Sequence, residues 1–106
     1  MRKLHYAVAV LGLFTLEGVK ADQAATLQIL QRNACTACHQ ATVKTVGPSW
    51  QDVANRYRDG SKTAAELGES VKKGSTGQWG PVPMPPQAQL NDADLATVTQ
   101  WILSSH

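Results

Sequence analysis

The segment CTACH spans residues 35–39 and decides how the rest of the chain is interpreted. Two thiols three positions apart, followed at once by a histidine, form the C-x-x-C-H pattern of c-type haem attachment. Cys35 and Cys38 can form thioethers with the two vinyl groups on one edge of a porphyrin. His39 is then placed under the ring, where an imidazole nitrogen can bind the iron. The motif therefore predicts one covalent haem c, with His39 as an axial ligand.

Three other roles remain open for the cysteine pair. A thioredoxin-like redox pair requires a βαβ setting, and no convincing strand pattern is present. A structural zinc site requires four ligands, but beyond residue 21 the chain offers only the two cysteines, His39 and His106. An inert buried pair is the third alternative. A disulfide within CTACH would close only a very short loop and would hold no distant segments together. The two cysteines therefore have a chemical role and do not form a structural disulfide.

The first 21 residues have the features of a secretory signal peptide. Arg2 and Lys3 supply a positive start, an apolar run follows over residues 7–16, and Ala21 is a suitable residue before a cleavage site. The run is short for a membrane-spanning helix, which needs about 20 residues. An uncleaved anchor is the alternative. We expect an exported protein with a signal peptide over residues 1–21 and no membrane span in its mature form.

The charge of the mature chain is balanced. The full sequence has 10 Lys and Arg against 8 Asp and Glu, a formal net charge of +2. Residues 1–21 hold three of the cations and one of the anions, which leaves seven of each beyond the leader. A nucleic-acid partner is not expected, because the mature chain has no excess of positive charge. So short a chain struggles to bury enough apolar surface alone, and a large flat cofactor would complete its core.

Apolar residues at helical spacing predict four short helices separated by long loops. The first spans about 24–34 and leads directly into Cys35. The last begins at Asn91 or Asp92, either of which can cap it. Its buried face is formed by Leu95, Val98 and Ile102.

The two middle helices have clear start signals. Ser49 followed by Asp52, and Thr63 followed by Glu66, each place an acidic residue three positions after a hydroxyl side chain, as in a capping box. Gly74 ends the second of these helices. The prediction is an all-α fold, with four to five short helices wrapped around one covalent haem.

The run GPVPMPP over residues 80–86 cannot form a helix or a central strand, because its prolines lack donors and fix φ. We expect a stiff loop, and long loops in a small domain are usually functional. Met84 in this run is the only methionine besides Met1. A methionine opposite a histidine closes the sixth position of haem iron and raises its reduction potential. Met84 is therefore predicted as the second axial ligand, with core packing as the alternative role.

Two residues are predicted to support the ligands. An iron-binding histidine usually donates its other ring N–H to a carbonyl, and the Pro48 carbonyl lies at a suitable distance along the chain to accept it. A simple turn at Gly47-Pro48 is the alternative. Trp79 directly precedes the methionine loop, where its indole N–H could bond a haem propionate and its ring could wall the cavity. Core packing is the competing role for Trp79.

Six stretches match one known pattern: CTACH 35–39, VGP 46–48, DVA 52–54, KGS 73–75, WGPVPMPP 79–86 and WILS 101–104. Together they resemble the small class I bacterial cytochromes c of the c-551 (c8) type. The resemblance covers essentially all of residues 22–106 and implies a monohaem cytochrome c domain there, compact and helical, with one haem edge exposed. It also supports the roles given to Pro48 and Trp79. Two positions depart from the family pattern: Gln87 stands where an asparagine commonly helps to hold the methionine loop, and Ser70 stands where a basic residue often faces a propionate.

The resemblance implies electron transport and no enzymatic activity. It implies a soluble periplasmic shuttle that carries electrons from a quinol-oxidising complex to a terminal reductase or oxidase, for example a nitrite reductase, through transient contacts with its redox partners. A dedicated haem subunit of a periplasmic dehydrogenase is the alternative. Catalysis at the iron would need an open position, which Met84 would close.

Overall fold

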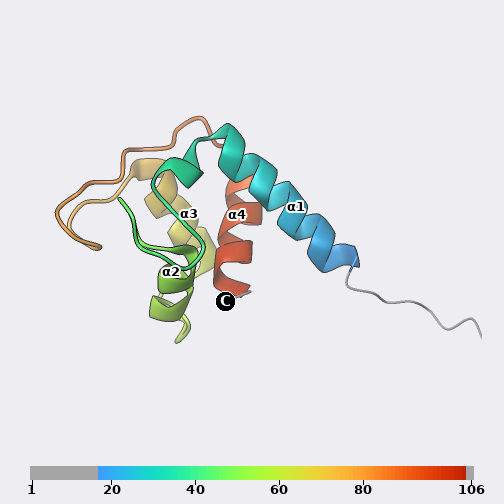
Figure 1. Ribbon diagram of the computed structural model, residues 1–106, viewed down its shortest axis with the longest axis horizontal. Coiled ribbons are helices and arrows are strands. Elements are labelled where there is room, and N and C mark those ends of the chain that lie inside the picture. The colour runs from blue at the N-terminus through green and yellow to red at the C-terminus, as the bar shows by residue number, and fades with distance from the viewer. Residues whose placement is uncertain (1–16, 105–106) are drawn as a thin grey trace, which may run out of the picture.

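The computed structural model describes residues 17–104, and side chains from residue 23 onward. Four α-helices and one 3-10 turn make up the fold, and no strand occurs in the described part of the chain (Figure 1). The all-α prediction is confirmed. Residues 1–16 of the predicted signal peptide lie outside the described residues. The elements are α1 (Glu17–Arg32), η1 (Cys35–Ala37), α2 (Trp50–Arg56), α3 (Ala64–Lys73) and α4 (Asp92–Ser104).

The first helix differs from its expected span of 24–34. α1 begins at Glu17, and the start of α1 extends away from the other helices (Figure 1). It ends at Arg32 because Ala34 adopts a left-handed conformation with φ 57° and ψ 23°, which turns the chain into η1. The backbone N–H and the side-chain amide of Asn33 both donate to the Ile29 carbonyl, at 3.2 and 2.8 Å, and so satisfy the end of the helix.

The middle helices begin as their capping signals predict. In α2 the Ser49 hydroxyl accepts from the Asp52 N–H at 3.0 Å, and the Asp52 carboxylate accepts from the Ser49 N–H at 3.2 Å. In α3 Thr63 and Glu66 form the same reciprocal pair, at 3.2 and 3.4 Å. Each capping box satisfies two backbone donors that would otherwise lack a partner. The predicted starts of both helices are confirmed.

The C-terminal helix α4 is the centre of the core, since it packs against α1, α2 and α3 (Figure 1). Its Asn91 side chain accepts from the Asp94 N–H at 2.8 Å, so Asn91 caps the helix. Leu30 on α1 is only 1% exposed, and Ile102 on α4 is 3% exposed. The buried apolar cluster consists of Ile29, Leu30, Trp50, Val53, Leu67, Leu90, Leu95, Val98 and Ile102.

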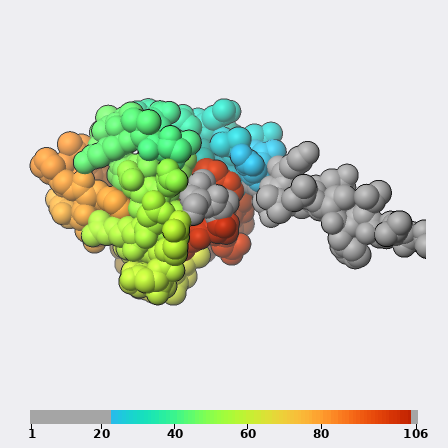
Figure 2. Space-filling view, turned by 60° about the horizontal axis from the view of Figure 1, so that its bottom comes forward, coloured from blue at the N-terminus to red at the C-terminus, as the bar shows by residue number. Residues whose placement is uncertain are grey.

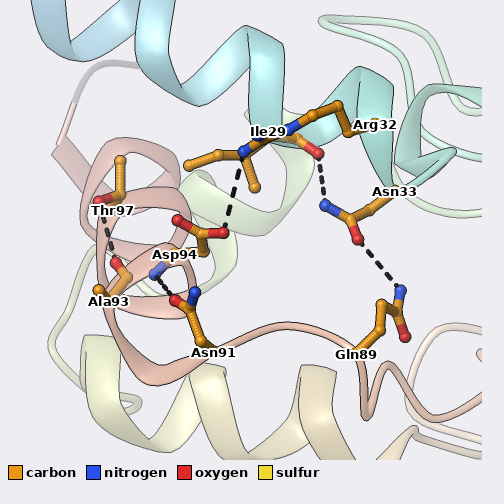
Figure 3. Close-up of polar contacts among 8 residues, drawn as sticks. All are labelled: Ile29, Arg32, Asn33, Gln89, Asn91, Ala93, Asp94 and Thr97. Atoms are coloured by element: carbon orange, nitrogen blue, oxygen red, sulfur yellow. Dashed lines mark hydrogen bonds and ion pairs between the residues drawn. The ribbon is translucent and has the colours of Figure 1, made fainter.

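Polar contacts join the end of α1 to the start of α4 (Figure 3). Gln89 donates from its amide to the Asn33 side-chain oxygen at 3.3 Å. The Arg32 guanidinium lies 3.9 Å from the Asp94 carboxylate. These contacts fix the segment before the CTACH motif against the segment that follows the proline-rich run.

Two long loops lie side by side, away from the start of α1. Residues 38–49 connect η1 to α2, and residues 74–91 connect α3 to α4. Both views show the first loop (green) next to the outer part of the second (orange), opposite the start of α1 (Figures 1 and 2). The predicted long loops are therefore present and face each other across one side of the helical core.

Candidate haem site

A cavity of about 330 Å³ lies between the two long loops and the helical core. Its lining is mostly apolar, and this size and character are typical of sites that bind small organic molecules. It brings together Cys35, Cys38, His39 and Met84, although Met84 is far from the others in the sequence. Pro48 and Trp79 line the same cavity. The structure therefore places all six residues singled out from the sequence around one space.

The CTACH motif begins on the single turn η1. The N–H groups of Cys38 and His39 both donate to the Cys35 carbonyl, at 3.2 and 3.0 Å. Both cysteines are half-buried free thiols. Burial raises the pKa of the Cys35 thiol, although a backbone hydrogen bond opposes that shift. A raised pKa is the reverse of what a reactive redox thiol needs.

The His39 imidazole has a defined proton position. Its Nδ1 lies 2.7 Å from the Pro48 carbonyl oxygen. Because a carbonyl can only accept, Nδ1 carries the hydrogen and donates it, and Nε2 of the neutral ring keeps a free lone pair. A neutral imidazole with such a free lone pair is the form of histidine that binds a metal.

Packing also fixes the plane of the His39 ring. Trp50 stacks on it, with ring centroids 4.7 Å apart and planes inclined by 26°. On the backbone side, a Cβ built on Gly47 would lie 2.7 Å from His39 Cε1, closer than real side chains approach. From the sequence, Gly47 is expected only as part of a turn. The contact of Trp50 and Gly47 with the imidazole depends on the folded path of the loop, and no local pattern indicated it.

Backbone contacts hold the loop that brings Pro48 to the histidine. The Gly47 N–H and the Thr45 hydroxyl both donate to the Cys38 carbonyl, each at 2.8 Å. The Trp50 N–H donates to the Gln40 carbonyl at 2.9 Å. The loop is thus folded back onto residues 38–40, and this fold determines where the Pro48 carbonyl lies.

Met84 is held through its backbone. It pairs with Ser75 across the loop: the Ser75 N–H donates to the Met84 carbonyl at 3.1 Å, and the Met84 N–H donates to the Ser75 carbonyl at 2.9 Å. Gly74 permits this pairing, because it has φ 78° and a Cβ there would lie 2.6 Å from the Met84 carbonyl oxygen. Only glycine adopts such a conformation at low cost in so close an approach.

Further contacts hold the chain after Met84. The Gln87 N–H donates to the Val71 carbonyl on α3 at 3.1 Å, and the Gln87 side-chain amide donates to the Pro85 carbonyl at 3.1 Å. Gln89 donates to the Gln87 side-chain oxygen at 2.8 Å. Gln87, noted as a departure from the family pattern, thus helps to hold the methionine loop with both its backbone and its side chain.

Trp79 is half-buried at one wall of the cavity. Its ring packs edge-on against Tyr57, with centroids 6.2 Å apart. The Arg56 guanidinium lies 4.3 Å from the Trp79 ring centroid and donates to the Gln78 carbonyl at 2.7 Å. The wall is therefore rigid, and the expected contact of the indole N–H with a propionate remains a prediction.

The residues present fit a haem. Two thiols, an imidazole with Nδ1 protonated and a thioether converge on one mostly apolar cavity. Two glycines, Gly47 and Gly74, leave room where any Cβ would press on His39 or on the Met84 carbonyl. A nitrogen and a sulfur donor on an apolar cofactor site match His/Met haem iron ligation. The described residues contain no cluster of three or more His, Cys, Asp or Glu suited to a metal ion.

Comparisons with known proteins agree with this geometry. Residues 24–106 match the family model described as Cytochrome c. The chain is 41% identical over 80 residues to cytochrome c-552 of Nitrosomonas europaea, covering 76% of this chain and 78% of the relative. It is 38% identical over 93 residues to cytochrome c-551 of Pseudomonas aeruginosa, covering 88% and 86%.

Solved structures give the same result for the fold. The crystal structure of Nitrosomonas europaea cytochrome c552 superimposes with a TM-score of 0.69 at 41% identity, covering 74% of this chain and 96% of that one. The class 1 cytochrome MtoD from Sideroxydans lithotrophicus ES-1 has the same fold, with a TM-score of 0.65 at 23% identity over 78% of this chain and 95% of that one. The chain thus belongs to the cytochrome c family, as a class I c-type cytochrome of the c-551/c-552 group, whose members bind one covalent haem c with its iron.

Proposed function

We propose that this protein is a periplasmic electron carrier with one haem c ligated by His39 and Met84. It takes electrons from a quinol-oxidising complex and delivers them to a terminal reductase or oxidase, such as a nitrite reductase. Cys35 and Cys38 would hold the haem through thioethers. When bound, the haem supplies an iron that accepts and releases one electron.

The observation that carries this proposal is the position of Met84 in the same cavity as the CTACH motif. A histidine and a methionine would fill both axial positions, so no site at the iron stays open for a substrate. A carrier needs such a closed site, whereas an enzyme acting at its iron needs an open one. The two backbone hydrogen bonds to Ser75 support Met84 in this role, because they fix the loop before any ligand binds.

Exposed apolar residues support contact with partner proteins. Val46 is 53% exposed and Val82 is 58% exposed, and both line the rim of the cavity, one on each long loop. These loops are adjacent on the surface (Figure 2). A small apolar rim suits the weak, short-lived contacts of electron-transfer proteins, which lie at the low end of interface sizes.

The first 21 residues support a periplasmic location, because their charge and apolar pattern match a cleaved signal peptide. No helix in the described part of the chain is long and apolar enough to cross a membrane. Mass spectrometry of the protein purified from a periplasmic extract tests this point. We expect the mature chain to begin after Ala21, with the added mass of one haem.

Two experiments test the electron-carrier role. Expression with the cytochrome c maturation machinery should give a covalently bound haem with a low-spin visible spectrum. The reduced protein should then be reoxidised by a terminal reductase at catalytic concentration. If the maturation machinery attached no haem, the proposal would be wrong. If a dehydrogenase co-purified in a stable one-to-one complex, the role of a dedicated subunit would replace that of a free carrier.

A further inference from the structure

One charged side chain lines the cavity. Of its lining residues, all of them in the described part of the chain, only Lys62 is a lysine, arginine, aspartate or glutamate. Lys62 lies in the turn between α2 and α3, directly before the Thr63 cap, and it is half-buried. A charged group is costly to hold beside an apolar space unless an opposite charge accompanies it.

The protein itself does not supply that opposite charge. The ion pairs among residues 23–104 join Arg32 to Asp94, Lys72 to Asp92 and Lys73 to Glu69, and none involves Lys62. The Lys62 ammonium instead lies 5.3 Å from the centroid of the Tyr57 ring, which also lines the cavity. This cation–π contact orients the ammonium, and its positive charge is not neutralised.

The other cationic residues near this wall have different roles. The Arg56 guanidinium covers the Trp79 ring at 4.3 Å and donates to the Gln78 carbonyl, and Arg56 does not line the cavity. On α3 the cavity is lined by Leu67, Ser70 and Val71. The Ser70 hydroxyl donates to the Glu66 carbonyl at 3.3 Å, so α3 presents no cation to the space.

The turn that carries Lys62 is also remote from η1, where the CTACH motif begins. Figure 1 shows η1 at the top of the molecule and the turn between α2 and α3 at the bottom. A haem attached at Cys35 and Cys38 would have its vinyl edge near η1. The two propionates of a porphyrin are on the edge opposite the vinyl groups, and they are its only negative charges outside the ring nitrogens.

We propose that Lys62 pairs with a haem propionate and thereby raises the reduction potential of the iron. The inference rests on the proposed haem site. An ammonium near the propionate reduces the negative potential at the iron, and the reduced state, which has one more electron, gains more from this than the oxidised state. Lys62 is a positioning and tuning residue, and it would supply the positive charge that Ser70 does not supply on α3.

The reduction potentials of Lys62→Gln and Lys72→Gln, measured by spectroelectrochemistry on the holoprotein, test this proposal. Both variants lose one positive charge, but Lys72 does not line the cavity. We expect Lys62→Gln to lower the ratio of reduced to oxidised protein at a fixed potential by about threefold, which is about 30 mV for one electron. Lys72→Gln should change the ratio much less, and Lys62→Arg should restore the wild-type value.

A second readout separates pairing from a general charge effect. The propionate pKa, followed through the NMR shifts of the propionate methylene protons, should rise in Lys62→Gln and stay unchanged in Lys72→Gln, because only Lys62 stabilises the ionised propionate. Equal potentials and equal propionate pKa values in the two variants, with covalent haem present in both, would overturn the proposal and leave the electron-carrier function intact. A wild-type protein without covalent haem would overturn both.

Discussion

The histidine side and the methionine side of the cavity are held by different means. The His39 side chain is fixed directly: its Nδ1 donates to the Pro48 carbonyl at 2.7 Å, and its ring stacks on Trp50 at 4.7 Å. Met84 is fixed one step back, through two backbone hydrogen bonds with Ser75. The contacts described for His39 act on its side chain, whereas the hydrogen bonds of Met84 act on its main chain.

The two sides of the cavity should therefore respond to different kinds of substitution. On the histidine side, changes that press on the ring act on the proposed ligand itself. On the methionine side, changes that displace the loop backbone move the residue as a whole. Gly47 and Gly74 are the matched positions. A Cβ on Gly47 would meet the side chain of His39, and a Cβ on Gly74 would meet the carbonyl of Met84.

The largest effect is expected from Met84→Ala. With the thioether removed, the sixth position of the iron is open, and the reduced variant should bind carbon monoxide stoichiometrically, whereas the wild type should not bind it. The visible spectrum under carbon monoxide measures this. Val82→Ala in the same loop is the control and should behave as the wild type. A Met84→Ala variant that kept its spectrum and refused carbon monoxide would show that Met84 is not a ligand.

The next effect is expected from Gly74→Ala. Gly74 has a φ of 78°, and a Cβ at this residue would lie 2.6 Å from the Met84 carbonyl oxygen. The conformation costs about 1–2 kcal/mol and the overlap about 1–3 kcal/mol, so urea unfolding should show a loss of about 3 kcal/mol.

Gly77→Ala is the matched control for Gly74→Ala, since Gly77 has φ 80° and open space around its Cβ position. It should lose only the conformational part, about 1–2 kcal/mol. Equal losses in the two variants would show that contact with the Met84 backbone does not restrict residue 74.

A smaller effect is expected from Gly47→Ala, which forces the His39 ring away from a Cβ only 2.7 Å distant. The φ of Gly47 is not in the left-handed range, so only the overlap counts, at about 1–3 kcal/mol. Urea unfolding measures the loss. Gly68→Ala is the control, because its Cβ would meet only ordinary contacts at 3.9 Å, and it should lose no stability. A Gly47→Ala variant as stable as the wild type would mean that the His39 ring can move away from the added Cβ at little cost in free energy.

The smallest effect is expected from Ala34→Gly, at the left-handed residue that leads into η1. Glycine avoids the strain of about 1–2 kcal/mol but costs about 0.5–1 kcal/mol in chain entropy. The net gain in the free energy of unfolding should be about 0.5 kcal/mol. Ala37→Gly, where φ is not positive, should instead lose stability. A loss at residue 34 as well would mean that the turn into η1 is not strained.

Much of the fold could be predicted from sequence because its signals are local. Ser49 and Thr63 start their helices through contacts with residues only three positions away. The predicted start of the first helix at about residue 24 is wrong, because the signal-peptide pattern extends to residue 21, whereas α1 begins at Glu17. The predicted end at residue 34 is also wrong, because α1 ends at Arg32. A glycine usually signals a left-handed turn at the end of a helix, and the alanine at residue 34 gives no such signal.

The candidate site has a sequence signal of a different kind, because its residue types and their spacing are rare. The CTACH motif and a lone methionine between prolines indicated residues that line one cavity, and their roles as ligands stay predictions. The Ser75–Met84 pairing and the ring contact of Gly47 could not be seen, because they join segments with no periodicity. The position of Lys62 at the cavity depends on how α2 and α3 meet, which no pattern in the turn reveals.

The tryptophans give the molecule a built-in optical reporter. Trp50 and Trp79 line the cavity, and Trp101 meets Trp50 edge-on at 6.1 Å. A porphyrin in that space absorbs the energy of excited indoles nearby, so the folded holoprotein should be almost dark in tryptophan emission. Emission should return as the chain expands. Opening of the cavity can therefore be timed without any added label. A variant that lacks Trp79 would report only on the wall formed by Trp50.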